Sequence, residues 1–217
     1  MSASVIAVAQ QKGGAGKTTV TAQLAAAWVE RRLRVACIDT DPQGTLGAWA
    51  ALRARTIRPP VEVRSVQGWR LGIALRELRA SHDVVLVDSP PHAESEARVV
   101  VRESDLVVIP CQPSLLDVWA IGATLDLVKA EKRPMAVVWN RTPPRGRALD
   151  EARAGLADAG AVPLEMGFGN RTAFAGSMHQ GLGAVESEPR SRAADEAREV
   201  ATRLLTIARG RSFGLAR

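Results

Sequence analysis

The stretch Lys12-Gly13-Gly14-Ala15-Gly16-Lys17-Thr18-Thr19 decides the fold. It follows the apolar run Val5–Ala9 and opens a helical pattern over Thr18–Arg32, so we expect a strand, a glycine-rich loop and a helix. Glycines let backbone N–H groups turn inward around phosphate oxygens without a Cβ clash, and the positive end of the helix points at the same anion. The stretch therefore predicts a phosphate-binding loop. The alternative is a glycine-rich turn that holds two lysines by chance.

Two side chains of this loop suit a triphosphate and its cation. Lys17 is expected to place its ammonium on the β- and γ-phosphates, and Thr18 offers a hydroxyl to Mg²⁺. The usual pattern has a glycine six positions before the lysine, where this chain has Gln11, so the loop is a variant with a second lysine, Lys12. The other loop residues predicted to contact ATP are Gly13, Gly14, Ala15, Gly16 and Thr19.

Strand-like and helical patterns alternate along the chain. The expected strands are Val5–Ala9, Val35–Ile38, Val61–Val66, Val84–Val87, Leu106–Ile109 and Met135–Trp139. The expected helices are Thr18–Arg32, Gly44–Arg55, Trp69–Ala80, Glu94–Arg102, Leu115–Lys129, Ala148–Ala159 and, after a glycine-rich stretch over Gly155–Gly183, Ser191–Arg209. Several strands are apolar throughout, which is typical of strands buried on both faces of a parallel sheet. We expect one α/β domain over residues 1–217, with a doubly wound, mostly parallel sheet and ligands at the carboxyl ends of its strands.

Composition limits the other classes of function. The net charge of +6 comes from 29 Lys and Arg against 23 Asp and Glu, which favours nucleic acid or anionic lipid as a partner, although many solvated helices are also rich in arginine. The chain has no tyrosine and three phenylalanines, which argues against a reader that stacks single-stranded bases. Cys37 and Cys111 lack metal-ligand spacing and are expected to be buried thiols. We expect neither a membrane span nor a secretory leader.

Carboxylates end two of the predicted strands. Asp39 and Asp41 follow the second strand two residues apart, and Asp88 ends the run Val84–Val87. Each has a structural alternative: Asp41 suits the N-cap of the following helix, and aspartates often end strands in turns. Phosphoryl transfer asks mainly for positioning and charge neutralisation, which acids at this edge of a sheet can provide.

Together these motifs resemble the deviant Walker A P-loop ATPases of the ParA/MinD family, most closely its short plasmid-partition members. The resemblance implies an ATPase with Mg²⁺, in which Lys12 reaches across a homodimer to the partner subunit's phosphates. It also implies that Asp41 orients the attacking water and contacts the Mg²⁺ shell with support from Asp39, and that Asp88 holds Mg²⁺ through water. Taken alone, Lys12 could equally be a solvated loop lysine.

The resemblance continues through the rest of the chain. The segment Pro110–Asp117 resembles the Pro-x-x-Pro-Ser-x-x-Asp loop of the short members, Ser89-Pro90-Pro91 resembles the second switch, and Asn140 stands where related proteins present an asparagine to the base. Asn140 could also be a turn residue after a strand. The resemblance implies DNA binding without sequence preference, which needs only dispersed cations. The candidate residues are Arg171, Arg190, Arg192 and Arg203, each of which could instead belong to a solvated face.

We therefore expect a cytoplasmic, nucleoid-associated ATPase that positions a plasmid, a chromosome or another cargo, as a dimer or a polymer, with a ParB-like partner that stimulates hydrolysis. Two alternatives stay open. A membrane-surface switch of the MinD kind needs an amphipathic C-terminal helix, and two glycines break the tail Arg209–Arg217. An amide synthase or ligase of related fold needs a substrate pocket, usually with an added domain, for which the chain has little room. An iron–sulfur relative is excluded because the cysteines that would bridge subunits near the second switch are missing.

Overall fold

A computed structural model describes residues 3–91, 94–144 and 146–210. The order of strands across its sheet is β3-β2-β4-β1-β5-β6, and every pair of neighbours is parallel. The strands of this described part are β1 Ser4–Val8, β2 Val35–Asp39, β3 Glu62–Ser65, β4 Val84–Asp88, β5 Leu106–Cys111 and β6 Met135–Trp139. The expected doubly wound α/β fold is confirmed.

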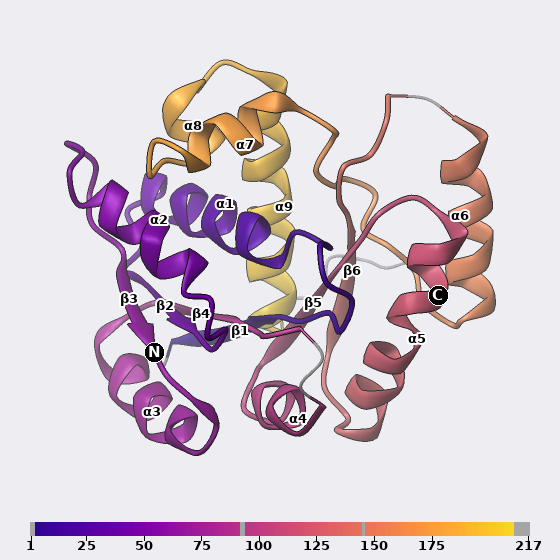
Figure 1. Cartoon of the computed structure of the whole chain (residues 1–217), viewed down its shortest axis with the longest axis horizontal. Coiled ribbons are helices and arrows are strands. Elements are labelled where there is room, and N and C mark those ends of the chain that lie inside the picture. The colour runs from indigo at the N-terminus through magenta and orange to yellow at the C-terminus, as the bar shows by residue number, and fades with distance from the viewer. Residues whose placement is uncertain (1–2, 92–93, 145, 211–217) are drawn as a thin grey trace.

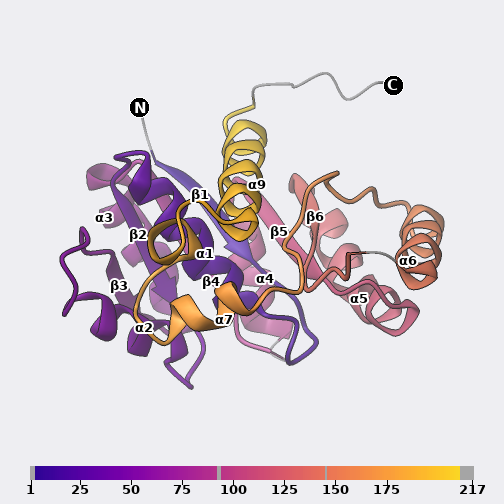
Figure 2. The same cartoon turned by 90° about the horizontal axis from the view of Figure 1, so that it is seen from above.

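Helices cover both faces of the sheet (Figure 1). On one face lie α1 Lys17–Glu30, α2 Thr45–Arg53, α7 Thr172–Met178, α8 Ala184–Ser187 and α9 Arg192–Ala208. On the other face lie α3 Leu71–Ser81, which follows a 3-10 turn at Gly68–Arg70, α4 Glu94–Arg102, α5 Leu115–Ala130 and α6 Arg147–Asp158. In both views α6 lies at the β6 edge of the molecule, opposite β3 and α3 (Figures 1 and 2).

The central strands are apolar throughout because each of their faces packs into a different core. In β1, Ile6 and Val8 contact the core under α1 and α9, whereas Val5 and Ala7 contact the core under α3 and α5. Successive side chains of a strand point to opposite faces, so a strand covered on both sides needs apolar residues at every position. β3 is half-exposed because it is the edge strand.

The C-terminal third is more helical than the sequence predicts. Two short helices that were not predicted, α7 and α8, lie within and just after the glycine-rich stretch Gly155–Gly183. The helix predicted over Ser191–Arg209 is confirmed as α9, which has a buried apolar stripe from Ala194 to Leu205 and a partly buried Ala208. Residues 211–217, most of the tail considered as a membrane anchor, lie outside the described residues. Among the described helices, none combines the length and the apolar character needed to cross a bilayer.

Candidate nucleotide site

The register of the sheet brings the predicted loop and acids together. Val8 at the end of β1 is paired with Asp88 at the end of β4, and Asp88 is in turn paired with Asp39 at the end of β2. The loop of residues 9–16 leaves β1 at this point and enters α1. One edge of a parallel sheet therefore holds the glycine-rich loop and the carboxylates of two neighbouring strands, as expected for ligand sites in such folds.

The loop adopts a backbone that requires glycine at two positions. Gly14 and Gly16 have φ angles of 78° and 86°, in the left-handed region that residues with a Cβ rarely adopt. A Cβ at Gly16 would also lie 2.4 Å from Nδ2 of Asn140. That amide donates a hydrogen bond to the carbonyl oxygen of Ala15 at 2.8 Å, so the end of β6 fixes the loop just before α1 begins.

Lys17 begins α1 and its side chain is turned toward the acids. It is 8% exposed, and burial lowers the pKa of its ammonium, while the nearby charges of Asp88 and Asp41 act in the opposite direction. Thr18 and Thr19 are half-buried in the same first turn, and Gly13 and Gly14 are exposed at the tip of the loop. The first turn of α1 thus presents free backbone N–H groups and one ammonium to an anion.

Asp88 has the features of a cation ligand. Burial raises the pKa of its carboxyl group to about 7, against the lowering effect of a hydrogen bond from Thr18. Its Oδ1 accepts from the hydroxyl of Thr21 at 3.4 Å, but its Oδ2 is buried and has no partner in the described part of the chain. The hydroxyl of Ser89 is likewise buried without a partner there. Buried polar atoms normally have a hydrogen-bond partner, so the oxygens of Asp88 and Ser89 suit a cation and its bound water.

The donor set fits Mg²⁺. Hydroxyl and carboxylate oxygens of Thr18, Asp41 and Asp88 surround the loop, and Mg²⁺ prefers oxygen ligands, with substrate phosphates and waters completing its shell. The described residues contain no group of three or more His, Cys, Asp or Glu side chains that could hold a metal ion by themselves.

Asp39, at the end of β2, supports Asp41, because its Oδ1 accepts from the backbone N–H of Asp41 at 3.1 Å. Asp39 caps α2: its Oδ2 accepts from the backbone N–H groups of Leu46 and Gly47 at 3.1 and 3.3 Å. Burial raises the pKa of the Asp39 carboxyl group, and these backbone hydrogen bonds act against the rise. Asp41, for which a capping role was the alternative, is half-buried and accepts only from the N–H of Gln43 among the described residues, at 3.0 Å. It therefore stays accessible to a ligand.

Lys12 is held within its own subunit. Its Nζ lies 2.7 Å from Oδ1 of Asp117, in the first turn of α5. Asp117 belongs to the Pro-x-x-Pro-Ser-x-x-Asp motif of the sequence, which by itself assigns it no role. The signal that pointed to it was the Ser-x-x-Asp spacing, which places this carboxylate at the start of a helix beside the capping residue Ser114.

The amide of Asn140 is largely used by the protein itself. Besides the bond to Ala15, its Oδ1 accepts from the N–H of Arg141 at 3.0 Å, and the residue is 6% exposed. One N–H hydrogen and one lone pair are left for a base. The adenine contact of Asn140 stays a prediction. Its hydrogen bond to Ala15 gives it a role in holding the loop.

The four arginines predicted to bind DNA differ in their surroundings. Arg171 forms two hydrogen bonds to the carboxylate of Glu196, at 2.9 and 2.6 Å, and Arg203 pairs with Glu199 at 2.5 Å. Arg192 is 82% exposed and lies 3.8 Å from Glu196. Arg190 is exposed and forms no ion pair within the described residues. Arg190 and Arg192 therefore have the most charge available for a phosphate.

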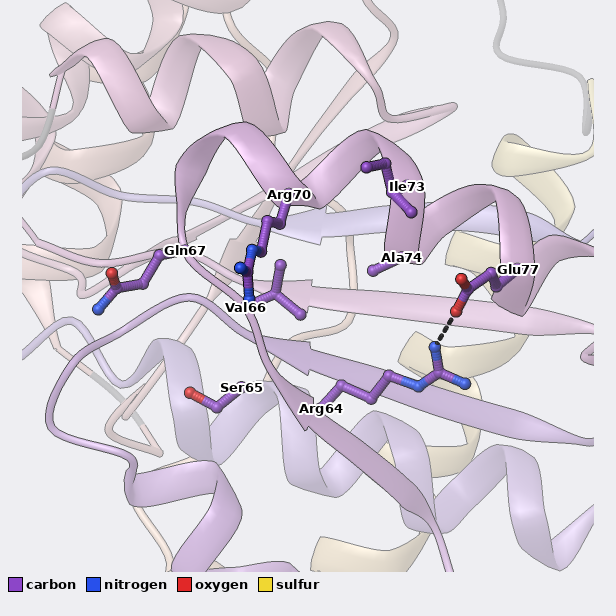
Figure 3. Close-up of a pocket in the computed structure, with 8 residues that line it drawn as sticks. All are labelled: Arg64, Ser65, Val66, Gln67, Arg70, Ile73, Ala74 and Glu77. Carbon is purple, nitrogen blue, oxygen red and sulfur yellow. Dashed lines mark hydrogen bonds and ion pairs between the residues drawn. The ribbon is translucent and has the colours of Figure 1, made fainter.

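One cavity is lined by residues outside the phosphate loop. It has a volume of about 990 Å³ between β3 and α3, and the ion pair of Arg64 and Glu77 spans it, at 2.6 Å (Figure 3). None of its lining residues belongs to the phosphate loop or follows an acid-ended strand.

Cys37 and Cys111 are free and buried, as predicted. Burial raises the pKa of the Cys111 thiol to about 12, so both behave as small apolar side chains.

Comparison with known proteins agrees with this geometry. The sequence profile of a family described as the CobQ/CobB/MinD/ParA nucleotide binding domain matches residues 6–166. A maintenance of carboxysome distribution protein A from Halothiobacillus neapolitanus is 29% identical over 91% of this chain and 94% of its own length. A protein of the same name from Gloeobacter kilaueensis is 35% identical over 69% of each chain.

Solved structures share the fold over almost the whole chain. The cell division ATPase MinD of Pyrococcus furiosus has a TM-score of 0.75 at 20% identity, over 94% of this chain and 99% of its own. A cobyrinic acid a,c-diamide synthase from Mycobacterium smegmatis with bound ADP and magnesium has a TM-score of 0.72 at 22% identity, over 94% of each chain. These likenesses show the shared fold.

Proposed function

This chain belongs to the CobQ/CobB/MinD/ParA nucleotide-binding family, and from that premise we propose that ATP joins two copies of it into a dimer that binds DNA and positions a cellular cargo. It is an ATPase, and it uses ATP with Mg²⁺. The observation that carries the proposal is Lys12. Lys17 already provides the ammonium for the phosphates bound by its own subunit. The second lysine of the loop, whose side chain is 39% exposed, is therefore available to bind the phosphates of another subunit.

The surface beside Lys12 supports a face-to-face dimer. Leu116 and Trp119, on the first turns of α5 next to Asp117, are 68% and 69% exposed. Apolar side chains gathered at one place on a surface often mark a contact with another protein. Closing this face against a second copy would bury them and bring each Lys12 toward the partner's phosphates, where two triphosphates concentrate negative charge.

Hydrolysis follows from the residues around the loop. The bound Mg²⁺ supplies charge neutralisation on the phosphates. In the proposed site Lys17 and the N–H groups of α1 hold the β- and γ-phosphates, Asp88 and Thr18 hold the cation, and Asp41 orients the attacking water. Lys12 of the partner subunit neutralises the remaining negative charge of the phosphates, so hydrolysis requires the dimer. Loss of the γ-phosphate then removes the contact that holds the dimer together.

DNA binding without sequence preference is the output we propose for the dimer. Arg190 and Arg192 lie at the entry to α9, and a dimer presents them twice, which raises the avidity for a phosphate backbone. Arg171 and Arg203 contribute less because carboxylates already neutralise them. The relative named for carboxysome distribution spans nearly the whole chain, which supports a protein-shelled compartment as one cargo beside a plasmid or a chromosome. We propose that a partner protein on the cargo stimulates hydrolysis.

Binding of the purified chain to an unspecific DNA duplex tests the proposal. Fluorescence anisotropy should give tight binding with Mg²⁺ and a slowly hydrolysed ATP analogue, a steep loss with salt, and little binding with ADP. Lys12→Ala should remove the difference between the two nucleotides. Equal DNA binding in both nucleotide states would contradict the proposal. Anionic vesicles in place of DNA test the membrane-surface alternative, which predicts nucleotide-dependent co-sedimentation.

A further inference from the structure

The two edges of the sheet differ in how their backbone is covered. At β6, the carbonyl oxygen of Trp139 accepts from the N–H of Phe168 at 2.8 Å, so the segment after α6 runs along that edge. At the other edge, β3 is hydrogen-bonded through its backbone to β2 alone among the described residues. An edge strand with open N–H and C=O groups is a template for pairing with another strand.

The register shows which groups of β3 are open. The N–H of Val66, directly after β3, donates to the carbonyl oxygen of Asp39 on β2 at 3.0 Å. Since the N–H groups of a strand alternate between its two sides, those of Val63 and Ser65 point away from β2. Outside the sheet, neither has a backbone acceptor in the described part of the chain. Both are therefore available to a strand added beside β3.

A groove lies along this edge, between β3 and α3 (Figure 3). Arg64 of β3 pairs with Glu77 of α3 across it, at 2.6 Å. Ile73 of α3 lines it and is 49% exposed, and Arg70 extends from the turn before α3 toward Val66. Side chains of a strand point alternately to its two faces, so every second residue of an added strand would enter this groove. The groove offers these residues one apolar and two cationic contacts.

The segment that forms the edge and the groove is strongly basic. Residues 54–80 contain six arginines and two glutamates, so they have a net charge of +4, out of +6 for the whole chain. The arginines are Arg55, Arg58, Arg64, Arg70, Arg76 and Arg79, and the glutamates are Glu62 and Glu77. A second copy of the chain would bring the same charge to this edge, which disfavours pairing between copies. An acidic segment of another protein would be attracted instead.

We propose that β3 and the groove bind an extended, acidic segment of a partner protein, which adds a strand to the sheet. Main-chain hydrogen bonds to Val63 and Ser65 hold the segment, and carboxylates that face the arginines select an acidic sequence. Duplex DNA also seeks positive charge, but it has no strand to pair with β3. The inference does not depend on the proposed dimer, because none of the groove-lining residues belongs to the phosphate loop.

A synthetic peptide in which glutamate and valine alternate, of roughly eight residues to match a usual strand, serves as the probe. Fluorescence anisotropy with the nucleotide-free full chain should show binding, and the same peptide with lysine in place of glutamate should not bind. Ser65→Pro removes one outward N–H and no bond to β2, a place where edge strands accept proline. It should weaken binding by about tenfold, whereas the control Ser65→Ala, which keeps the N–H, should change it by less than about twofold.

A second pair of variants tests the charge. Arg70→Gln removes a cation from the groove, and Arg147→Gln removes the same charge from α6 at the β6 edge, where the side chain is 92% exposed (Figure 1). Arg70→Gln should weaken the binding of the acidic peptide by about fivefold or more, with Arg147→Gln like the wild type. An equal loss in both variants would mean that net charge alone attracts the peptide, and the proposal would then be wrong.

Hydrogen exchange followed by NMR examines the added strand in the wild type and needs no variant. With saturating peptide, the amides of Val63 and Ser65 should exchange at least about tenfold more slowly, whereas the amide of Val66, already bonded to Asp39, should change little. Bound peptide with unchanged exchange at Val63 and Ser65, or a wild type that does not bind the peptide, would overturn the proposal. Binding of duplex DNA that Arg70→Gln weakens, without binding of the peptide, would assign this surface to nucleic acid and would equally overturn it.

Discussion

A buried ion pair connects the helix after Asp41 to the C-terminal part of the chain, and removing its carboxylate should destabilise the protein strongly. The guanidinium of Arg53 on α2 donates two hydrogen bonds of 2.7 Å to Glu186 on α8, and the two side chains are 0% and 5% exposed. Arg53 also donates to the carbonyl oxygens of Pro59 and Gly181 and lies 5.4 Å from the ring centre of Trp49.

The magnitude follows from the charge that would be left behind. Glu186→Ala leaves a guanidinium buried without a carboxylate, and breaking a buried pair in this way costs about 3–5 kcal/mol. A domain of this size loses about 2–4 °C in Tm for each kcal/mol, so Tm should fall by roughly 6–20 °C. The double variant Arg53→Met/Glu186→Leu removes both charges and should recover most of the loss, because the desolvation cost disappears together with the attraction.

Thermal unfolding followed by circular dichroism measures both effects in nucleotide-free protein. Glu151→Ala is the control, because it breaks the exposed pair of Arg147 and Glu151 on α6, which should change the stability by at most about 0.5 kcal/mol. If Glu186→Ala melted within about 2 °C of the wild type, the pair would not carry the assigned energy. A double variant less stable than Glu186→Ala would also refute the reasoning.

The remaining predictions concern the site and the DNA surface. Burial raises the pKa of Asp88 to about 7 from an unfolded value near 4, so between these pH values the protein takes up a proton on folding. The stability that this proton uptake contributes is complete below about pH 4 and is lost as pH rises to 7. The Tm of nucleotide-free Asp88→Asn should therefore vary less with pH than the Tm of the wild type, and an equal dependence of Tm on pH in both proteins would contradict this. Gly16→Ala should weaken ATP binding in calorimetry by at least about tenfold, and more than Gly14→Ala, because only the former meets the buried asparagine amide; the reverse order would argue against it. Arg190→Ala/Arg192→Ala should lower the salt slope of DNA binding by up to about 4 units per dimer, and an unchanged slope would place the DNA contact elsewhere.

Much of the fold and the centre of the site could be predicted because their signals are local. A strand buried on both faces is apolar at each position, as in Val84–Val87, and the phosphate loop must be glycine-rich because Gly14 and Gly16 have positive φ angles. Asp88, at the end of β4, could be predicted as a site residue because parallel strands present their carboxyl ends at one edge of the sheet. Each of these requirements can be seen in a few consecutive residues of the sequence.

The parts that could not be predicted depend on contacts between distant segments. Asp39 and Asp41 are two residues apart and chemically alike, and only the position of α2 makes Asp39 the cap and leaves Asp41 accessible. The partner of Arg171 is 25 residues away on α9, and that of Lys12 is 105 residues away on α5. The Ser-x-x-Asp spacing marks Asp117 as a residue at the start of a helix, but only the fold shows that its partner is Lys12.

The central claim is that ATP joins two copies of this chain through Lys12. Sedimentation velocity of the wild type and of Lys12→Ala, each with Mg²⁺ and either ADP or a slowly hydrolysed ATP analogue, tests it most directly. The account predicts that the wild type becomes a dimer with the analogue and stays a monomer with ADP, whereas Lys12→Ala is a monomer with both nucleotides. A wild type that binds the analogue tightly yet stays monomeric, or a Lys12→Ala variant that dimerises as the wild type does, would contradict it.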